Sequence, residues 1–252
     1  MELEDIRWCS KCWTPSTRPR ITFDSHGVCN ACQHNLEKQT INWRERQYYF
    51  GTVCDKYRKK GGEPDCIVPF SGGKDSIYVA YKMRDEFGMT PLLVTVLPDF
   101  ETEIGEWNRK NTCPGFQRLE ITLGTEKYKR LARQYFIEQG RPKHPWETAI
   151  SAVVINQAWK LGIPLIVYGE EGEQEYGGSD REKDRWKLPA DKDYLMQFYW
   201  QEKLDWEIPS DAEFERIFFT QYSRFENWSP SRHADFAIAN GMRTKPVRSV
   251  GT

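Results

Sequence analysis

The sequence predicts an α/β fold with a doubly wound parallel sheet, preceded by a small cysteine-rich module at the amino-terminal end. Three observations lead to this expectation. From residue 64 onward short apolar runs alternate with segments of helical periodicity, a glycine-rich turn follows the first apolar run, and two Cys-x-x-Cys pairs stand before residue 33. Alternating strands and helices are the pattern of a parallel sheet with both faces covered by helices.

Length and charge exclude several classes of protein. The chain has 252 residues with 36 basic and 37 acidic side chains, which suits one domain with a small appendage. No apolar run approaches the ~18 residues that span a membrane, and no basic-then-apolar leader follows Met1. We therefore expect a cytoplasmic protein without a membrane partner. A net charge of −1 argues against a protein that binds nucleic acid in bulk.

The cysteine pairs are Cys9-Ser-Lys-Cys12 and Cys29-Asn-Ala-Cys32, with 16 residues between them. This spacing is typical of a zinc ribbon, in which each pair straddles a tight turn and four thiolates bind one ion. Two disulfides or four unrelated core thiols are the alternatives, but disulfides do not persist in the cytosol. A structural zinc contributes roughly 10–16 kcal/mol of apparent binding, against about 2–4 kcal/mol for a disulfide. We expect a zinc-ribbon module over residues 1–40 that holds structural Zn²⁺.

A helix of alternating aromatic and basic residues is expected to link this module to the main domain, which spans residues 63–252. The linking segment, 41–62, ends at a pair of glycines. Apolar runs predict four strands, at residues 66–70, 91–97, 118–123 and 163–168. Helical spacing predicts helices at residues 75–87, 127–139 and 146–161, and the segment 181–252 is aromatic and irregular. Ligands of such sheets bind at the carboxyl ends of the strands, which makes the expected loops there, 71–76, 98–109 and 169–180, the candidate site.

The turn after the first predicted strand carries the chemistry. It reads Ser71-Gly72-Gly73-Lys74-Asp75-Ser76. Two glycines let the backbone approach phosphate oxygens, and the N–H groups of the turn and of the helix start point at the anion. The serine hydroxyls can donate hydrogen bonds, the lysine adds a positive charge and the aspartate can hold Mg²⁺. We expect this loop to bind the phosphates of ATP, although its spacing is not that of a Walker A loop.

Ser71 to Ser76 resembles the pyrophosphatase loop (PP-loop) of the N-type ATP pyrophosphatases. In that superfamily the loop holds the β,γ-phosphates as leaving pyrophosphate, while a substrate carbonyl oxygen attacks the α-phosphate and a nucleophile then displaces AMP. The resemblance implies that Lys74 stabilises the transition state and that Asp75 holds Mg²⁺. Asp99, just after the second predicted strand, is placed to meet the ribose or adenine, and a solvated loop carboxylate is an equal alternative.

The chain also resembles the N-acetyl sugar amidotransferases of bacterial surface-polysaccharide synthesis, the pathway class of lipopolysaccharide and O-antigen. The match rests on the order of the cysteine ribbon, the PP-loop, Thr102-Glu-Ile-Gly-Glu-Trp-Asn108 and Gly169-Glu-Glu-Gly-Glu-Gln-Glu-Tyr-Gly-Gly178. It implies ATP-driven adenylation of the acetamido oxygen of an N-acetyl sugar. Attack by ammonia then gives an acetamidino sugar and AMP, with pyrophosphate released in the first step. Separate glutaminase and cyclase-like subunits would deliver the ammonia.

On this resemblance the expected catalytic residues are Lys74, Asp75 and Glu170, and the expected sugar contacts are Thr102, Asn108, Glu173 and Tyr176. A solvated surface is an equal alternative for the two glutamates. The family usually has Asn where this chain has Glu171, which puts the hydrogen-bonding role of that position in doubt. Relatives continue past a segment like the last four residues, so a shortened form is expected.

Two other functions stay open. A tRNA thiolation enzyme of the same superfamily also carries this loop and a cysteine ribbon, but it usually needs further catalytic cysteines and a basic face. Cys54, Cys66 and Cys113 form no Cys-x-x-Cys pair, and residues 63–252 carry 25 basic against 30 acidic side chains. A non-catalytic zinc-ribbon scaffold is the third hypothesis. We expect His233 to be structural or exposed.

Overall fold

The computed structural model describes residues 6–98, 100–170, 185–190, 193, 195, 207 and 209–245. The chain divides into two compact units, each built from stretches that are far apart in sequence. The first unit takes Met1–Phe50, Glu170–Leu188 and Gln221–Trp228, and the second takes Gly51–Gly169, Pro189–Thr220 and Ser229–Thr252. We predicted consecutive parts, with boundaries at residues 40 and 62, whereas each of these units is made of separated stretches. The predicted boundaries stay a prediction.

The first unit has an aromatic core. Its elements are the helix α1 (Asn30–Glu37), the 3₁₀ turns η2 (Lys38–Thr40) and η4 (Tyr222–Arg224), and the first half of helix α2 (Trp43–Tyr57). The ring of Phe50 stacks on that of Phe225 with centroids 4.5 Å apart. The guanidinium of Arg46 donates to the backbone oxygen of Arg224 at 2.9 Å and lies 4.8 Å from the ring of Trp186. These contacts join the three stretches of the unit.

The second unit is built on a five-stranded sheet. Its strands are β1 (Cys66–Pro69), β2 (Pro91–Val96), β3 (Gln117–Ile121), β4 (Leu165–Tyr168) and β5 (Phe218–Gln221), and their spatial order is β3-β2-β1-β4-β5. β1 pairs in parallel with β2 and with β4, and β2 pairs in parallel with β3. The chain winds outward from β1 to β3 and then crosses back to β4. The direction of winding therefore reverses between β1 and β4, where open α/β sheets bind ligands.

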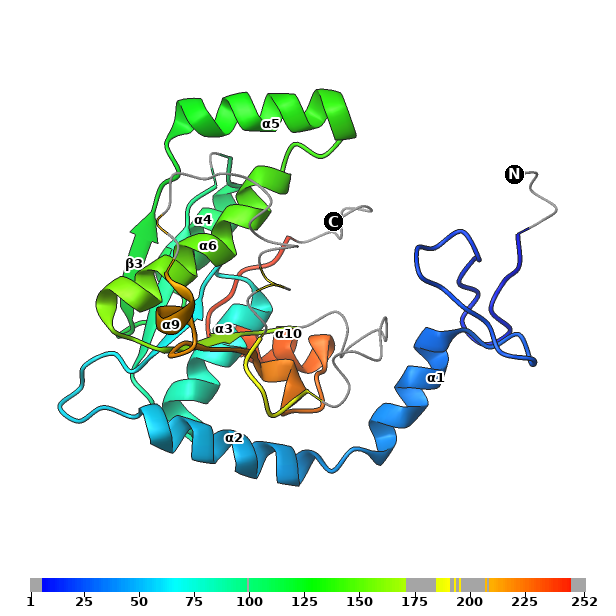
Figure 1. The fold of residues 1–252 in the computed structure, drawn as a ribbon, viewed down its shortest axis with the longest axis horizontal. Helices are drawn as coiled ribbons and strands as arrows, with labels where there is room; N and C mark the ends of the chain where they lie inside the picture. Colours follow the sequence, from blue (N-terminus) through cyan, green and yellow to red (C-terminus); the bar gives the residue numbers. More distant parts are fainter. Residues whose placement is uncertain are drawn as a thin grey trace. The chain divides into compact units, whose positions relative to one another are not determined.

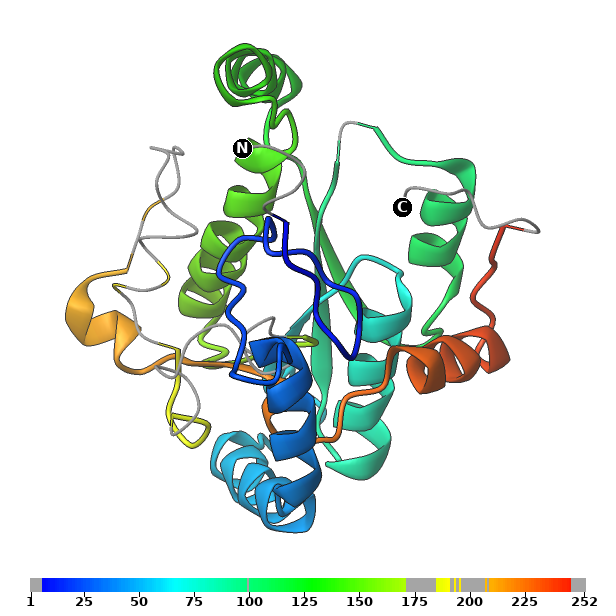
Figure 2. The same cartoon turned by 90° about the vertical axis from the view of Figure 1, so that its right-hand side faces the viewer.

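Helices cover both faces of this sheet. The helices that follow β1 are α3 (Lys74–Tyr81), continued by a π-helical turn η3 (Lys82–Glu86), then α4 (Glu103–Asn111), α5 (Thr125–Gln139), α6 (His144–Leu161), the short α9 (Asp211–Phe214) and α10 (Pro230–Ala239) (Figure 1). Of these, α5 packs on α6 and α10 packs on α3. Right-handed crossovers place α3 and α4 on one face and α6 on the other. Figure 2 shows α6 in green and α3 in cyan on opposite sides of the strands. The predicted α/β fold with a parallel sheet is therefore confirmed.

The predicted strands and helices agree with the structure to within a few residues, but several further elements were not predicted, among them α1, α4, α9, β5 and α10. In the segment 98–109, which we expected to be a loop, residues 103–109 belong to α4. The region beyond residue 181, which we expected to be irregular, contains β5 and α10. β5 has only four residues, a length at which apolar periodicity cannot distinguish a strand from a loop. No helix among the described residues is long and apolar enough to cross a membrane.

The start of β1 is held by a buried carboxylate. Asp65 is 1% exposed, and its two oxygens accept hydrogen bonds from the backbone N–H of Thr90 at 2.8 Å and of Lys59 at 3.3 Å. Its own N–H donates to the backbone oxygen of Thr90 at 3.1 Å. One side chain thus ties the segment after α2 and the start of β2 to the central strand. Behind it lies the apolar core between the sheet and α6, which includes Ile67 and Ile155.

We predict that Asp65→Ala lowers the free energy of unfolding by about 1–3 kcal/mol, because two partly buried N–H donors lose their acceptor. Urea unfolding followed by circular dichroism measures the change. Glu63→Ala is the matched control, since Glu63 is exposed two residues away and should shift the midpoint little. Equal effects of the two substitutions would contradict this role of Asp65.

Candidate functional site

The loop 71–73 leaves the carboxyl end of β1 and turns directly into α3. The residue before it, Phe70, donates its N–H to the backbone oxygen of Val94 at 2.8 Å and accepts the hydroxyl of Thr95 at 2.6 Å. Within the loop, Ser71 and Ser76 are joined side chain to side chain at 3.4 Å, and the Ser76 hydroxyl donates to the backbone oxygen of Gly73 at 3.0 Å. The loop is therefore ordered by its own serines before any ligand is bound.

The start of α3 is open to an anion. Gly73 is the N-cap of α3, and because it has no side chain it makes no side-chain bond to the first N–H groups of the helix. Such groups carry the positive end of the helix dipole and are a general binding site for phosphate. Lys74 adds an ammonium at the first helical position. The N–H groups and the ammonium of the predicted anion site thus lie together at the point where the sheet changes its direction of winding.

Gly72 brings the loop against the backbone of α4. Its φ is +74°, and a Cβ at this position would lie 2.5 Å from the backbone nitrogen of Arg109 and 2.7 Å from its Cα. Only glycine allows both the left-handed conformation and this close approach. The shape of the loop therefore depends on the position of α4, which the sequence analysis did not anticipate.

Two arginines anchor α4 behind the loop. The side chain of Arg109 is 6% exposed, and it pairs with Glu101 at 2.9 Å and with Glu120. These carboxylates, Glu101 first, raise the pKa of Arg109, so its charge is permanent. Arg118 donates to the backbone oxygens of Arg109 at 2.6 Å and of Cys113 at 3.0 Å. The resulting network fixes the helix end against which Gly72 packs.

Asp75 has a partner on each oxygen. Its Oδ1 lies 3.0 Å from Nδ1 of His233, and its Oδ2 lies 2.5 Å from the ammonium of Lys74. Burial alone would raise the pKa of Asp75, but the hydrogen bond from His233 and the charge of Lys74 outweigh burial and lower the pKa. The carboxylate is therefore ionised at neutral pH and has the oxygen ligands that Mg²⁺ prefers. His233 is fully buried, as a structural residue should be, but sequence reasoning did not connect it with the loop.

The residues predicted to contact a sugar have structural partners. Thr102 is the N-cap of α4, and its hydroxyl accepts the N–H of Gly105 at 3.1 Å. The side-chain amide of Asn108 donates to the backbone oxygen of Arg243 at 2.9 Å and accepts its N–H at 2.8 Å. Glu170 is exposed and begins a stretch of the first unit. Asp99, Glu171, Glu173 and Tyr176 lie outside the described residues.

The four predicted cysteines come together in the first unit. Their sulfurs lie within 4.8 Å of one another, with Cys9 to Cys32 at 4.0 Å and Cys12 to Cys29 at 3.6 Å. A tetrahedral zinc with bonds of about 2.3 Å requires sulfurs about 3.8 Å apart, so the set fits the ion. The sulfurs are too far apart for the disulfides that were the alternative, and all four cysteines are free.

The cluster is prepared for a cation. Burial alone would raise the pKa of Cys9, but the backbone N–H groups of Cys29, Cys12 and Lys11 point at its sulfur and lower the pKa to about 6. Burial and the neighbouring sulfurs raise the pKa of Cys32 to about 12. Four thiols held this closely do not all ionise without a cation among them. The local geometry therefore supports a structural zinc site.

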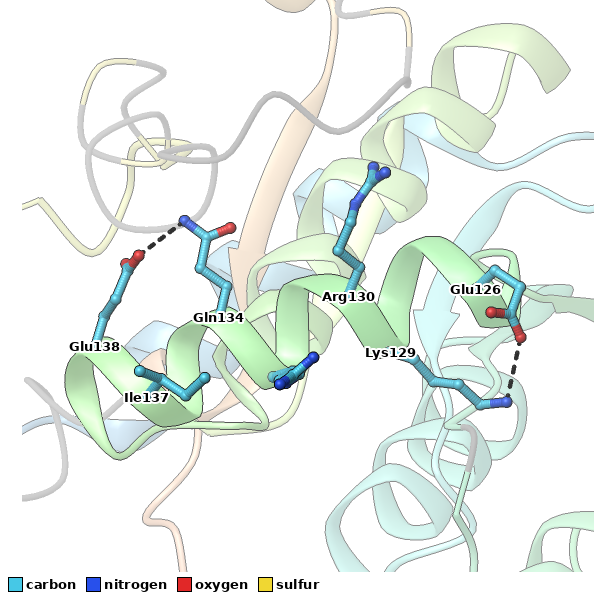
Figure 3. Close-up of a pocket in the computed structure, with 7 residues that line it drawn as sticks. Glu126, Lys129, Arg130, Gln134, Ile137 and Glu138 are labelled. Carbon is cyan, nitrogen blue, oxygen red and sulfur yellow. Dashed lines mark hydrogen bonds and ion pairs between the residues drawn. The ribbon is translucent and has the colours of Figure 1, made fainter.

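A surface groove of about 510 Å³ lies elsewhere, along α5 (Figure 3). Every residue that lines it belongs to this helix, and none belongs to the loop 71–76: Glu126, Lys129, Arg130, Arg133, Gln134, Ile137 and Glu138. Lys129 pairs with Glu126 at 3.3 Å, and the neutral amide of Gln134 donates to Glu138 at 3.1 Å. The three basic side chains therefore exceed the two carboxylates by one positive charge. The groove is therefore an exposed surface of mixed charge with a small positive excess, and not an enclosed pocket.

Comparison with known proteins gives distant matches. No protein-family profile matches the chain. An uncharacterized protein of Methanocaldococcus jannaschii is 26% identical over 168 residues, which are 65% of this chain and 58% of that protein. The chain thus spans less than two thirds of the length of this relative. A solved structure, a predicted subunit of tRNA methyltransferase from the same organism, is 20% identical, covers 69% of this chain and 75% of its own, and has a TM-score of 0.39. A likeness at this level identifies neither substrate nor activity.

We predict that Gly72→Ala lowers the free energy of unfolding by more than the ~1–2 kcal/mol that a left-handed Cβ costs, because the new methyl group also meets the backbone of Arg109. Thermal unfolding measures the effect. Gly73→Ala is the control, since Gly73 has a negative φ and its Cβ would meet only the Ser71 hydroxyl, at 3.2 Å. Equal stability of the two variants would contradict the close approach.

We also predict that the purified chain contains about one zinc ion, which the Cys12→Ser variant binds much more weakly, because a hydroxyl is a poor replacement for a thiolate ligand. Zinc should be released as the pH falls, since protons compete for the four sulfurs. Elemental analysis measures the metal content. Cys54→Ser, a change at a cysteine of α2 that is not one of the four clustered sulfurs, is the control and should keep its zinc. Equal zinc in both variants would be the contrary result.

Proposed function

We propose that the chain is an ATP pyrophosphatase of the PP-loop type, which activates an acceptor by transferring AMP to it. The observation that supports this best is the loop 71–76 at the carboxyl end of β1. It combines open N–H groups at a helix start, an ammonium and an ionised carboxylate at the reversal point of a parallel sheet. This set of groups suits a triphosphate with its metal ion.

The residues of the loop have separate tasks in this reaction. The N–H groups at the start of α3 bind the β,γ-phosphates, and Lys74 stabilises the charge that develops on them. Asp75 is the residue that would hold Mg²⁺, which neutralises phosphate charge when bound. An acceptor oxygen attacks the α-phosphorus as the bond to the β-phosphate oxygen breaks, so pyrophosphate leaves and an adenylated acceptor remains. A nucleophile then attacks the activated carbon of the acceptor and AMP departs.

Two classes of acceptor have support of different kinds. The amide of an N-acetyl sugar, with ammonia from separate glutaminase and cyclase-like subunits, is supported by the sequence resemblance alone. A tRNA acceptor is supported by exposed groups of the first unit, where Trp8 is 54% and Trp13 is 74% exposed. The basic residues Arg7, Lys11, Arg18 and Arg20 are exposed in the same stretch. Aromatic and basic side chains together are the means by which proteins bind unpaired bases and their phosphates.

The charge balance of the whole chain is therefore a weak argument against RNA. The near-zero total includes an exposed side of α5 where Lys129, Arg130 and Arg133 outnumber Glu126 and Glu138. Proteins bind nucleic acid through such local patches, whatever their net charge. We therefore propose the tRNA acceptor as the second candidate function, and the choice between the two acceptors is a matter for experiment.

We predict that the chain with Mg²⁺ and ATP forms AMP and pyrophosphate when it receives its acceptor. One reaction contains a UDP-N-acetyl sugar and ammonium, and the other contains tRNA and sulfide. Lys74→Ala should reduce AMP formation by about 10²–10³-fold, because it removes a charge from the transition state. Lys160→Ala, an exposed lysine of α6, is the control.

Replacement of the amide oxygen by NH lowers the mass of the sugar by about 1 Da. A product with this mass identifies the N-acetyl sugar as the acceptor. AMP formation that needs tRNA identifies tRNA as the acceptor. Absence of AMP and pyrophosphate in both reactions, together with absence of ATP binding, would overturn the proposed function.

A further inference from the structure

α10 packs on α3 beside the loop, although 158 residues separate the two partners that meet there. His233 of α10 is 0% exposed, and its Nδ1 lies 3.0 Å from Oδ1 of Asp75. Asp75 is in the first turn of α3. A fully buried imidazole therefore contacts a carboxylate of the proposed ATP site, in a unit that also contains the whole loop.

The position of His233 is fixed from several directions. The hydroxyl of Ser229 caps α10 by accepting the N–H of Arg232 at 3.4 Å, and Pro230 occupies the first helical position. The N–H of His233 donates to the backbone oxygen of Ser229 at 3.0 Å. Its ring stacks on that of Tyr78 with centroids 4.0 Å apart and planes 25° apart. The imidazole therefore has little freedom to rotate.

The next turn of α10 supports the same contact. Phe236 meets the ring of Tyr78 edge-on at 5.3 Å and that of Tyr81 at 5.6 Å. His233 and Phe236 are three residues apart, as are Tyr78 and Tyr81, so each pair presents one face of its helix. This aromatic packing holds α10 in register with the first turn of α3.

The two oxygens of Asp75 differ in how firmly they are held. Oδ1 faces a ring that is buried and stacked, whereas Oδ2 faces the ammonium of Lys74, whose side chain is 35% exposed on a flexible stem. A bound triphosphate competes for this ammonium, because phosphate carries more charge than a carboxylate. Lys74 can leave Oδ2 for the phosphate, and His233 cannot leave Oδ1. Since the carboxylate is ionised and only accepts, Nδ1 carries the proton of this hydrogen bond.

We propose that His233 is a positioning residue of the ATP site, which holds Oδ1 of Asp75 so that Oδ2 stays directed at the metal ion of the bound nucleotide. This inference rests on the proposed function. A carboxylate held on one oxygen loses less rotational freedom when the other oxygen binds a cation. His233 touches neither the nucleotide nor the metal ion itself and acts through Asp75.

Titration of the full chain with Mg²⁺-ATP, followed by calorimetry, tests the proposal. His233→Leu removes the donor and should weaken binding about 10–100-fold, the usual loss for a hydrogen bond to a charged group. His233→Asn places an amide N–H where Nδ1 was and should stay within about 3-fold of the parent chain. His233→Gln places its amide near the position of Nε2 instead, so it should resemble the leucine variant while keeping polarity and size.

Two further measurements separate positioning from packing. In an Asp75→Ala background, His233→Leu should cause no additional loss of affinity, because the group through which it acts is absent. Binding of ATP in EDTA should be equal in the parent chain and in His233→Leu, because no metal ion is then held. Phe236→Leu disturbs the packing on both tyrosines and keeps the hydrogen bond, so it should lower thermal stability and leave Mg²⁺-ATP affinity near that of the parent.

Each contrary result has a defined meaning. Equal affinity in the leucine, asparagine and parent forms would overturn the positioning role, and so would a further loss in the Asp75→Ala background. Should His233→Leu fail to fold, the comparison of His233→Asn with His233→Gln decides, and equal affinity of these two overturns the role. A parent chain that binds no ATP, with or without Mg²⁺, overturns the proposed function and this inference together.

Discussion

The contact between Gly72 and the backbone of α4 is the constraint on which the candidate site depends. A loop that must bind phosphate through its N–H groups needs a fixed backbone shape, and here a second backbone sets that shape at a distance that leaves no room for a side chain. α4 can serve as that surface because Arg109 and Arg118 tie it to neighbouring carboxylates and carbonyls. The ion pairs of the buried Arg109 guanidinium thus fix the backbone against which the loop packs, and a loop of fixed shape loses less entropy on binding.

α10 completes the same site from the far end of the chain. His233 of α10 forms a hydrogen bond with Asp75 and so sets the orientation of that carboxylate. Two of the three segments of the second unit, the one that contains the loop and the one that contains α10, therefore meet at the first turn of α3. Residues of the predicted sugar motif also take part in this framework, since Thr102 caps α4 and Asn108 binds the backbone of Arg243. Their sequence pattern has a structural explanation that is independent of any sugar.

The second unit and the cysteine module of the first unit are stabilised by different means. The second unit buries a conventional apolar core between a parallel sheet and its helices. The cysteine module has few buried side chains apart from Cys9, Cys29 and His34, and its tryptophans are exposed, so four sulfurs around one ion are the natural source of its stability. The same exposure leaves the aromatic and basic side chains of the module available to a partner such as RNA.

The sequence by itself determined the features that local chemistry controls. Spacing identified the four cysteines, and alternation of apolar runs with helical segments identified the parallel sheet and the loop 71–76, because periodicity and motif spacing are properties of neighbouring residues. Ser229 followed by Pro230 is a typical sequence for the start of a helix, here α10, but it does not indicate what the helix contacts. Only the tertiary structure decided that α4 presses on Gly72, that Asn108 binds Arg243 and that His233 holds Asp75. These contacts join residues between 36 and 158 positions apart. These long-range contacts form only when the helices pack in the folded chain, so a pattern of neighbouring residues cannot predict them.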